Sequence, residues 1–206
     1  MDPFQSYDQQ SIQEVITDLQ LLLKKTKDNT IITGLNNAIS KLNKLINNDP
    51  NIKSEEIKYQ EGKYIGQVSN GLAEGRGKSI FNNGDIFTGF CKKGKAEGRG
   101  IKCWANGDRY EGEYKNDKKD GKGIYFYHNG DRYEGLWKCG GRSHTGSYLY
   151  KNGDRYDGDW KNDKKEGKGI YYYHNGDRRM GNYLNDKPIG KHIILRKNGD
   201  VESTFY

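Results

Sequence analysis

Cysteines and histidines are the side chains of this chain that could hold a metal ion or attack a substrate. The three cysteines, Cys91, Cys103 and Cys139, form no C-x-x-C pair and are odd in number, whereas disulfide frameworks use even sets. His128 and His174 occupy the same repeat position two repeats apart, roughly 19 Å in a sheet, which is too far for one shared metal ion. We therefore expect free thiols, no metal site and no cofactor.

Other patterns that could belong to an enzyme have simpler interpretations. The Gly121-Lys-Gly123 segment opens a strand pattern rather than a strand-to-helix turn, so it is no dinucleotide-binding fingerprint. Several carboxylates alternate with glycine along strands and fit a solvated face better than general acid–base pairs: Glu111, Glu113, Asp157 and Asp159. No serine or cysteine lies in a recognisable nucleophile motif. The sequence therefore predicts a protein that is not an enzyme.

A turn signal recurs at one fixed interval through most of the chain. The tripeptide Asn-Gly-Asp is repeated every 23 residues, starting at Asn83, Asn106, Asn129, Asn152, Asn175 and Asn198. Aromatic-x-Gly-x-aromatic segments such as Tyr133–Trp137 follow each turn, and Gly-x-Gly with further aromatics precedes it. Because this alternation has a period of two and Asn-Gly joins hairpins, we expect each repeat to be two short antiparallel strands.

The length of the Asn-Gly-Asp loop decides which residues share a face of the sheet. A loop with an odd number of residues places the glycines and aromatic rings together, with Trp137 lying over a glycine that leaves room for the indole. A two-residue turn would instead bring Ile124 and Phe126 to that face. We favour the odd loop because it gathers rings and glycines.

The Tyr-x-Gly-x-Trp and Gly-x-Gly pattern at this period resembles the MORN-repeat family, over about residues 64–201. The resemblance implies an elongated single-layer antiparallel ribbon, a non-catalytic scaffold that binds proteins, end-to-end dimers, and membership of cytoskeletal assemblies, ciliary axonemes especially. We expect departures in the first two and the sixth copies to reflect capping of the array, and His144 in the fourth copy to mark a bend. The departures at the ends are Val68, Cys91, Arg179, Pro188 and His192.

Before the repeats, two apolar series follow helical spacing. The first includes Ile12 and Leu19, and the second includes Leu35 and Leu42, with Thr30 as the expected N-cap. We expect a helical hairpin over residues 1–48, a linker and entry to the repeats over 49–63, and six repeats plus a partial seventh strand over 64–206. The helices could pack on each other and on the ribbon, or dock on a partner or a second copy; the sequence does not separate these.

Composition and charge restrict the partners. The chain is 32% hydrophobic and 31% charged, with net charge +7. Lysines between the two strands of a repeat could bind anionic phosphoinositides: Lys118, Lys119, Lys164 and Lys165. Neighbouring acids interrupt each cluster, however, and the readable lipid signal is a contiguous basic run. Nucleic acid is not expected, because the aromatic rings are needed for packing.

Protein partners fit the pattern better than lipid. The face opposite the glycines would carry Ile124, Phe126, Ile170 and Tyr172 among charged residues, and the final strand would leave an open edge at Phe205 and Tyr206, which another chain could extend. The sequence shows neither a signal peptide nor an apolar run of about 20 residues. We expect a cytoplasmic scaffold subunit, cytoskeletal or ciliary, with a phosphoinositide-binding adaptor as the alternative.

Overall fold

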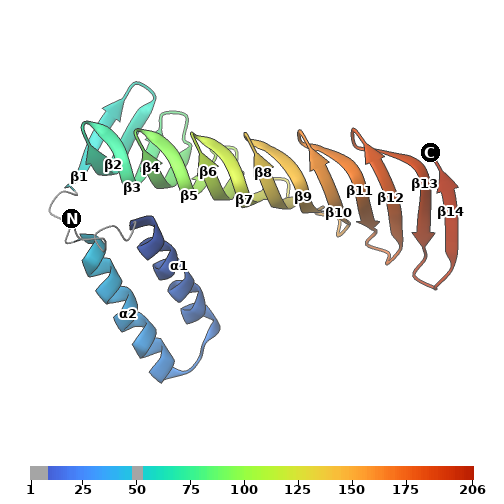
Figure 1. Cartoon of the computed structure of the whole chain (residues 1–206), viewed down its shortest axis with the longest axis horizontal. Helices are drawn as coiled ribbons and strands as arrows, with labels where there is room; N and C mark the ends of the chain where they lie inside the picture. The colour runs from blue at the N-terminus through green and yellow to red at the C-terminus, as the bar shows by residue number, and fades with distance from the viewer. Residues whose placement is uncertain (1–8, 48–52) are drawn as a thin grey trace, which may run out of the picture.

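The computed structural model describes residues 9–47 and 53–206, with side chains described for 15–42 and 54–206. Two helices, α1 (Gln9–Lys25) and α2 (Asn29–Asn47), precede 14 strands that form one antiparallel sheet in sequence order (Figure 1). The strands are β1 (Lys53–Tyr59), β2 (Gly62–Ser69), β3 (Leu72–Phe81), β4 (Ile86–Lys92), β5 (Lys95–Cys103), β6 (Arg109–Lys115), β7 (Lys118–Phe126), β8 (Arg132–Lys138), β9 (Gly141–Leu149), β10 (Arg155–Lys161), β11 (Lys164–Tyr172), β12 (Arg178–Leu184), β13 (Lys187–Leu195) and β14 (Val201–Phe205). The predicted fold class, a helical hairpin and a single-layer ribbon, is confirmed.

Two kinds of turn alternate along the ribbon. At one side, two-residue turns such as Asn116-Asp117 join strands with both residues at positive φ, the geometry that matches strand twist. At the other side, the Asn-Gly-Asp loops leave five residues between paired positions, as between Phe126 and Arg132. The odd loop is therefore confirmed, and glycines face glycines across five of these six pairs, whereas His192 faces Thr204 in the last.

From β2 onward, each two-residue hairpin carries a bulge beside its glycines. In the pair of β6 and β7, Gly112 faces Gly123, whereas Tyr114 faces Lys119, so β7 holds extra residues between the two positions. Gly121 lies in this bulge at φ 107°, a conformation that favours glycine. His144 adopts φ 56° at the equivalent position, and β9 makes the same kind of register shift as the other copies. The expected special bend at His144 is therefore absent.

Tyrosine rings, rather than the tryptophans, lie over the glycines. Tyr133 is fully buried, and a Cβ on Gly146 of the next strand would stand 2.6 Å from its ring. The Tyr133 hydroxyl donates to the Leu136 carbonyl at 3.1 Å. Trp137 packs edge-on against Tyr133, with ring centroids 5.1 Å apart, and donates from Nε1 to the Gly123 carbonyl at 3.2 Å. The expectation that Trp137 covers a glycine is wrong; it packs against the ring that does.

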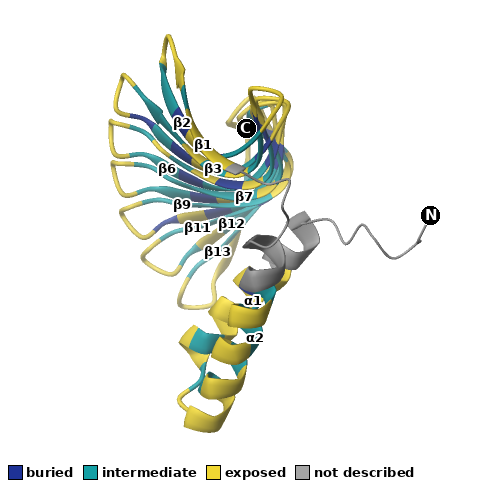
Figure 2. Ribbon diagram, turned by 90° about the vertical axis from the view of Figure 1, so that its left-hand side faces the viewer, coloured by how far each residue is buried: buried dark blue, intermediate teal, exposed yellow. Residues whose placement is uncertain are grey.

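This arrangement gives the sheet two distinct faces. The ring face carries the buried aromatic core, including Tyr64, Phe87, Tyr110, Tyr133 and Tyr156. The opposite face carries the residues between them in sequence. Figure 2 shows the strands bending into an open trough, with the buried residues midway along them. Because a single sheet has no second layer, the rings themselves must exclude water from the core.

Carboxylates of the Asn-Gly-Asp loops join successive repeats. Asp131 accepts hydrogen bonds from the Asn129 amide (3.0 Å), the Tyr148 hydroxyl (2.8 Å) and the Lys151 backbone amide (2.9 Å). Asp154 does the same with Asn152, Tyr171 and His174. The third residue of the tripeptide is thus a link to the following repeat as well as part of a turn.

The sixth copy supplies its ring from the opposite strand. Arg179 stands where earlier copies have tyrosine, and His192 stands where they have glycine. The fully buried His192 ring lies over Gly181, and its Nε2 contacts the Asn182 carbonyl at 2.9 Å, as the Tyr156 hydroxyl contacts that of Asp159. The two departures therefore compensate each other: the ring that is missing at Arg179 is supplied by His192. Capping of the array alone does not explain this exchange.

The helices form a hairpin beside the first half of the ribbon (Figure 1). Asp28 is the N-cap of α2, since its carboxylate accepts from the Thr30 amide at 2.8 Å; the expectation of Thr30 was two residues too late. On α1, Ile16 is buried, while Thr17 and Gln20 line a cavity together with the opposite face of β2 to β6. The hairpin thus lies toward the face that lacks the rings.

Candidate interaction surfaces

The opposite face holds a groove along its middle. Backbone of the glycine rows forms part of its lining, because glycine sends no side chain to either face. The groove has a volume of ≈ 870 Å³ and is open to solvent along the sheet. Its side chains are a mixture of apolar and charged groups: Arg99, Glu113, Lys122, Ile124, Glu134, Leu136, Thr145, Ser147 and Asp157.

The four residues predicted for this face lie there in two pairs. Ile124 and Phe126 are half-buried on β7, and Ile170 and Tyr172 are half-buried on β11. Arginines flank both rings: Arg109 and Arg132 lie 5.6 and 5.7 Å from the Phe126 ring centre, and two more arginines lie 4.2 and 5.5 Å from that of Tyr172. Each aromatic ring thus lies between two guanidinium groups.

The C-terminal edge is only partly as expected. Strand β14 pairs with β13 alone and forms one edge of the sheet. Phe205 is 81% exposed, whereas the Tyr206 ring packs edge-on against His192 at 5.1 Å and its hydroxyl contacts the Arg179 guanidinium. Phe205 is therefore the freer of the two terminal rings for a partner.

The sequence profile described as the MORN repeat matches residues 64–86, 88–109, 110–132 and 156–178. The chain carries MORN repeats. The bounds of the matches follow the 23-residue period of the Asn-Gly-Asp loops. The hairpins outside the matched ranges continue the same sheet with the substitutions described above.

Two similar solved structures share 17% sequence identity with this chain. One similar solved structure is the SAS-4 (dCPAP) TCP domain in complex with a proline-rich motif of Ana2 (dSTIL), of Drosophila melanogaster, at 17% identity and TM-score 0.45, over 74% of this chain and 90% of that chain. Another is streptogramin B lyase, at 17% identity and TM-score 0.18, over 76% of this chain and 45% of that chain. No protein with a curated description matches the chain. The MORN assignment therefore depends on the repeat itself.

The lysines of the MORN hairpins lie in two different environments. Lys118 and Lys164 are exposed. Lys119 is half-buried on the ring face, with its Nζ 3.7 Å from the centre of the Trp137 ring, and burial lowers the pKa of this ammonium to about 8. Lys165 lies likewise 4.7 Å from the Tyr156 ring centre. Of the four lysines considered for lipid, two therefore contact rings of the MORN core.

Three of the four predicted helix positions are described, and all three are half-buried. These are Leu19, Leu35 and Leu42, while the side chain of Ile12 lies outside the described residues. Other apolar residues of the hairpin are exposed: Val15, Leu21, Leu22 and Ile31. Val15, Leu22 and Ile31 belong to the two apolar series that the sequence predicts, whereas Leu21 lies outside them. Neither described helix is long and apolar enough to span a membrane.

The side chains of the ribbon that could hold a metal ion or react are its cysteines, histidines and carboxylates. Within the described part of the chain, no cluster of three or more His, Cys, Asp and Glu side chains could hold a metal ion. The three cysteines are free; Cys103 and Cys139 are exposed, and burial raises the pKa of the Cys91 thiol to about 12. The thiol of Cys91 is thus held protonated within the MORN core.

Proposed function

We propose that this chain is a non-catalytic scaffold subunit that binds other proteins through the opposite face of its MORN ribbon. MORN repeats indicate a protein-interaction module. The observation that supports this use of the face is the pair of ring-and-arginine clusters around Phe126 and Tyr172, on the face that also holds the groove of ≈ 870 Å³.

Physical considerations favour the opposite face over the ring face. Aromatic and arginine side chains contribute most of the binding energy in many protein interfaces. Here they are held on a rigid sheet, so little conformational entropy is lost when a partner docks. On the ring face the tyrosines are buried by their own neighbours, and most of that surface is already used for folding.

Our proposal extends to the assembly. The family resemblance supports a cytoskeletal or ciliary complex, and the β14 edge with the exposed Phe205 supports contact with a second copy of the chain. Sedimentation equilibrium of the wild type and of Phe205→Asp tests the second copy. A dimer that persists unchanged in the variant would exclude this edge.

The test of the function is quantitative affinity capture from the source cells with the full chain. The variant Phe126→Glu/Tyr172→Glu should lose stoichiometric protein partners, while Lys118→Glu/Lys164→Glu should retain them. Circular dichroism checks that both variants fold. Partners retained by the first variant would contradict the proposal.

The same variants separate the alternative of lipid binding. Salt-sensitive binding to liposomes containing phosphoinositide, lost in Lys118→Glu/Lys164→Glu and kept in the aromatic variant, would instead support the membrane adaptor.

A further inference from the structure

One position of the repeat changes from alanine to a cation along the ribbon. At intervals of 23 residues the chain has Ala73, Ala96, Lys119, Arg142 and Lys165, and then Pro188. The three cations point onto rings of the core, as described for Lys119 and Lys165. The two alanines leave the corresponding space unfilled by a side chain of their own.

Arg142 shows what normally fills this space. Its guanidinium lies 4.3 Å from the centre of the Trp160 ring and 5.7 Å from that of Tyr133. Its Nε donates to Asp163 at 3.2 Å, and the same carboxylate accepts from the Arg142 backbone amide at 2.9 Å. The Tyr148 ring lies 5.4 Å from the same guanidinium, so three rings and one carboxylate surround the cation.

Most of these surroundings recur around Ala96, 46 residues earlier, although Lys102 stands where the third ring, Tyr148, would be. Phe87 and Tyr114 stand 5.2 Å apart at 82°, and their counterparts Tyr133 and Trp160 stand 5.3 Å apart at 81°. Asp117, the counterpart of Asp163, accepts from the Ala96 backbone amide at 2.7 Å. Two of the three rings and the carboxylate are thus in place, and the residue between them ends at Cβ.

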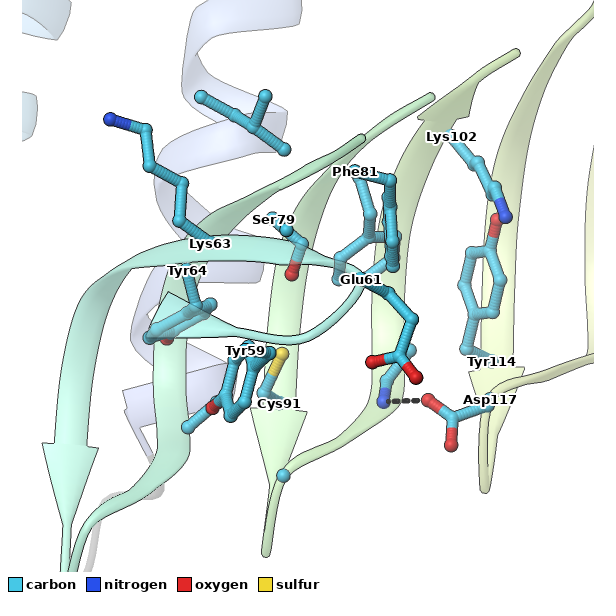
Figure 3. A pocket seen from close by; sticks show the side chains of 16 residues that line it. Tyr59, Glu61, Lys63, Tyr64, Ser79, Phe81, Cys91, Lys102, Tyr114 and Asp117 are labelled. Atoms are coloured by element: carbon cyan, nitrogen blue, oxygen red, sulfur yellow. Dashed lines mark hydrogen bonds between the residues drawn. The ribbon is translucent and has the colours of Figure 1, made fainter. Parts of the chain in front are cut away.

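A cavity of ≈ 470 Å³ lies at this place on the ring face. It extends over both alanine positions, since Ala73 and Ala96 line it together with the small Cys91. Figure 3 shows Lys102, Tyr114 and Asp117 on one side of the cavity and Tyr59, Tyr64 and Cys91 on the other.

Two polar groups of the cavity lack the partner that a ligand could supply. The Tyr114 hydroxyl is buried without a hydrogen-bond partner among the described residues, and Tyr114 as a whole is only 6% exposed. Glu61 lines the cavity and forms no ion pair within the described part of the chain. The positive charges that line the cavity are matched outside it: Lys102 by Asp85 at 3.4 Å and Lys63 by Glu56 at 3.1 Å. The uncompensated charge at the cavity is therefore negative.

We propose that this cavity binds an arginine side chain of a protein partner. The guanidinium would lie on the Tyr114 and Phe87 rings and bond to Asp117, as Arg142 does with its own rings and Asp163. The alkyl part would pass over Ala96. This inference rests on the proposed protein-binding function. The cavity would be a second contact with the partner, on the ring face, whereas Phe126 lies on the opposite face.

Nuclear magnetic resonance of the full, isotopically labelled chain tests this site without a partner. N-acetyl-arginine N-methylamide is the probe, and the matching citrulline compound, which is neutral and of similar shape, is the control. We expect saturable shifts of the Ala96 and Tyr114 amides with the arginine probe and binding at least tenfold weaker with citrulline. Equal binding of both, or no saturable shift with either, would overturn the proposal.

Variants locate the binding. Ala96→Arg should fill the cavity from within, raise the melting temperature and abolish probe binding. Asp117→Asn should weaken binding at least tenfold, whereas Asp163→Asn, at the site that Arg142 already fills, should leave it unchanged. Probe binding that survives Ala96→Arg contradicts the assignment.

The probe measurement uses no cellular partner, so its result is independent of the affinity capture proposed above. Loss of partners in Phe126→Glu/Tyr172→Glu with no probe binding would overturn the arginine site alone. Probe binding in a chain that captures no protein would overturn the scaffold function alone.

Discussion

At the residue scale, the structure depends on rings that need bare backbone beneath them. Tyr156 lies across Gly158 of its own strand and Gly169 of the next, and its hydroxyl bonds to the Asp159 carbonyl at 3.3 Å. Edge-on contacts with Trp160 and Tyr183 complete the cluster. Each such aromatic pair contributes about 0.5–1.5 kcal/mol beyond the area it buries, so one misplaced ring weakens several contacts.

Replacing Gly169 by alanine tests this packing. The new Cβ would stand 2.6 Å from Tyr156 Cζ, and overpacking of this kind lowers the free energy of unfolding by about 1–3 kcal/mol. Gly34→Ala in α2 is the control: no atom lies within 4 Å of its added Cβ, and alanine favours a helix. Thermal denaturation should show a lower melting temperature for Gly169→Ala alone; equal values for both variants would refute the packing.

The exchange of ring and glycine in the sixth copy gives a double-mutant cycle. Arg179→Tyr alone would place a second ring where His192 already lies, and His192→Gly alone would leave that place empty, so each single change should be destabilising. The double variant restores the arrangement of the other copies and should recover most of the loss. Unfolding by urea measures the coupling; additive effects would show that the two residues do not share one site.

The sequence predicted the ring-and-glycine face, because period-two alternation fixes which residues share a face. It did not identify which ring covers the glycine: Tyr133 and Trp137 alternate identically with Gly135, and only their side-chain directions separate them. The role of His192 was not predicted either. Its ring replaces the one that is missing at Arg179 on the neighbouring strand, and this relation is visible only when the two strands are paired.

At the element scale, the Asn-Gly-Asp loops hold neighbouring repeats together. The Asp154 carboxylate accepts from the His174 amide at 2.8 Å and from the Tyr171 hydroxyl at 2.8 Å. Burial alone would raise the pKa of Asp154, but these hydrogen bonds and those of the His174 ring and Asn152 outweigh it and bring the pKa to about 2. The same holds for Asp108. The loops are therefore charged links as well as turns.

Acid should weaken these links in a definite pH window. Because the folded pKa of Asp154 is about 2 and the ordinary value 3.8, the charged carboxylate stabilises the fold fully above about pH 4. This contribution falls as the pH drops toward 2. Urea unfolding at pH 6 should show Asp154→Asn less stable than the wild type by on the order of 1 kcal/mol, with the gap closing near pH 2. A gap independent of pH would contradict the role of the charge.

Turn chemistry was partly predictable. The odd length of the Asn-Gly-Asp loops was predictable, because only an odd loop places the rings and glycines on one face. The two-residue turns at the other side share no sequence motif, since they vary from Lys93-Gly94 to Asn162-Asp163. The cavity at Ala96 was not predicted. Its signal in the sequence is the alanine at a position that holds Lys119 and Arg142 in the next two repeats. Cys91 was noted only as a departure from the pattern.

At the scale of the whole molecule, the ribbon is a linear array. Each strand pairs only with its neighbours in sequence, from β1 to β14. Stability should then be a sum of repeats and of interfaces between adjacent repeats. The ring face holds the packing between neighbouring repeats. The opposite face carries Phe126 and Tyr172 between their arginines, and we propose that a partner spanning several repeats binds there.

Hydrogen–deuterium exchange of the full chain and of Gly169→Ala tests the central claim most directly, since it reports the stability of each strand separately. If each repeat packs only on its neighbours, Gly169→Ala should exchange faster than the wild type in β10 to β14, which hold Tyr156 and the rings that follow it. Exchange in β2 to β5 should be unchanged. An equal increase in every strand would contradict this packing, because the sheet would then unfold as one cooperative unit rather than as an array of repeats.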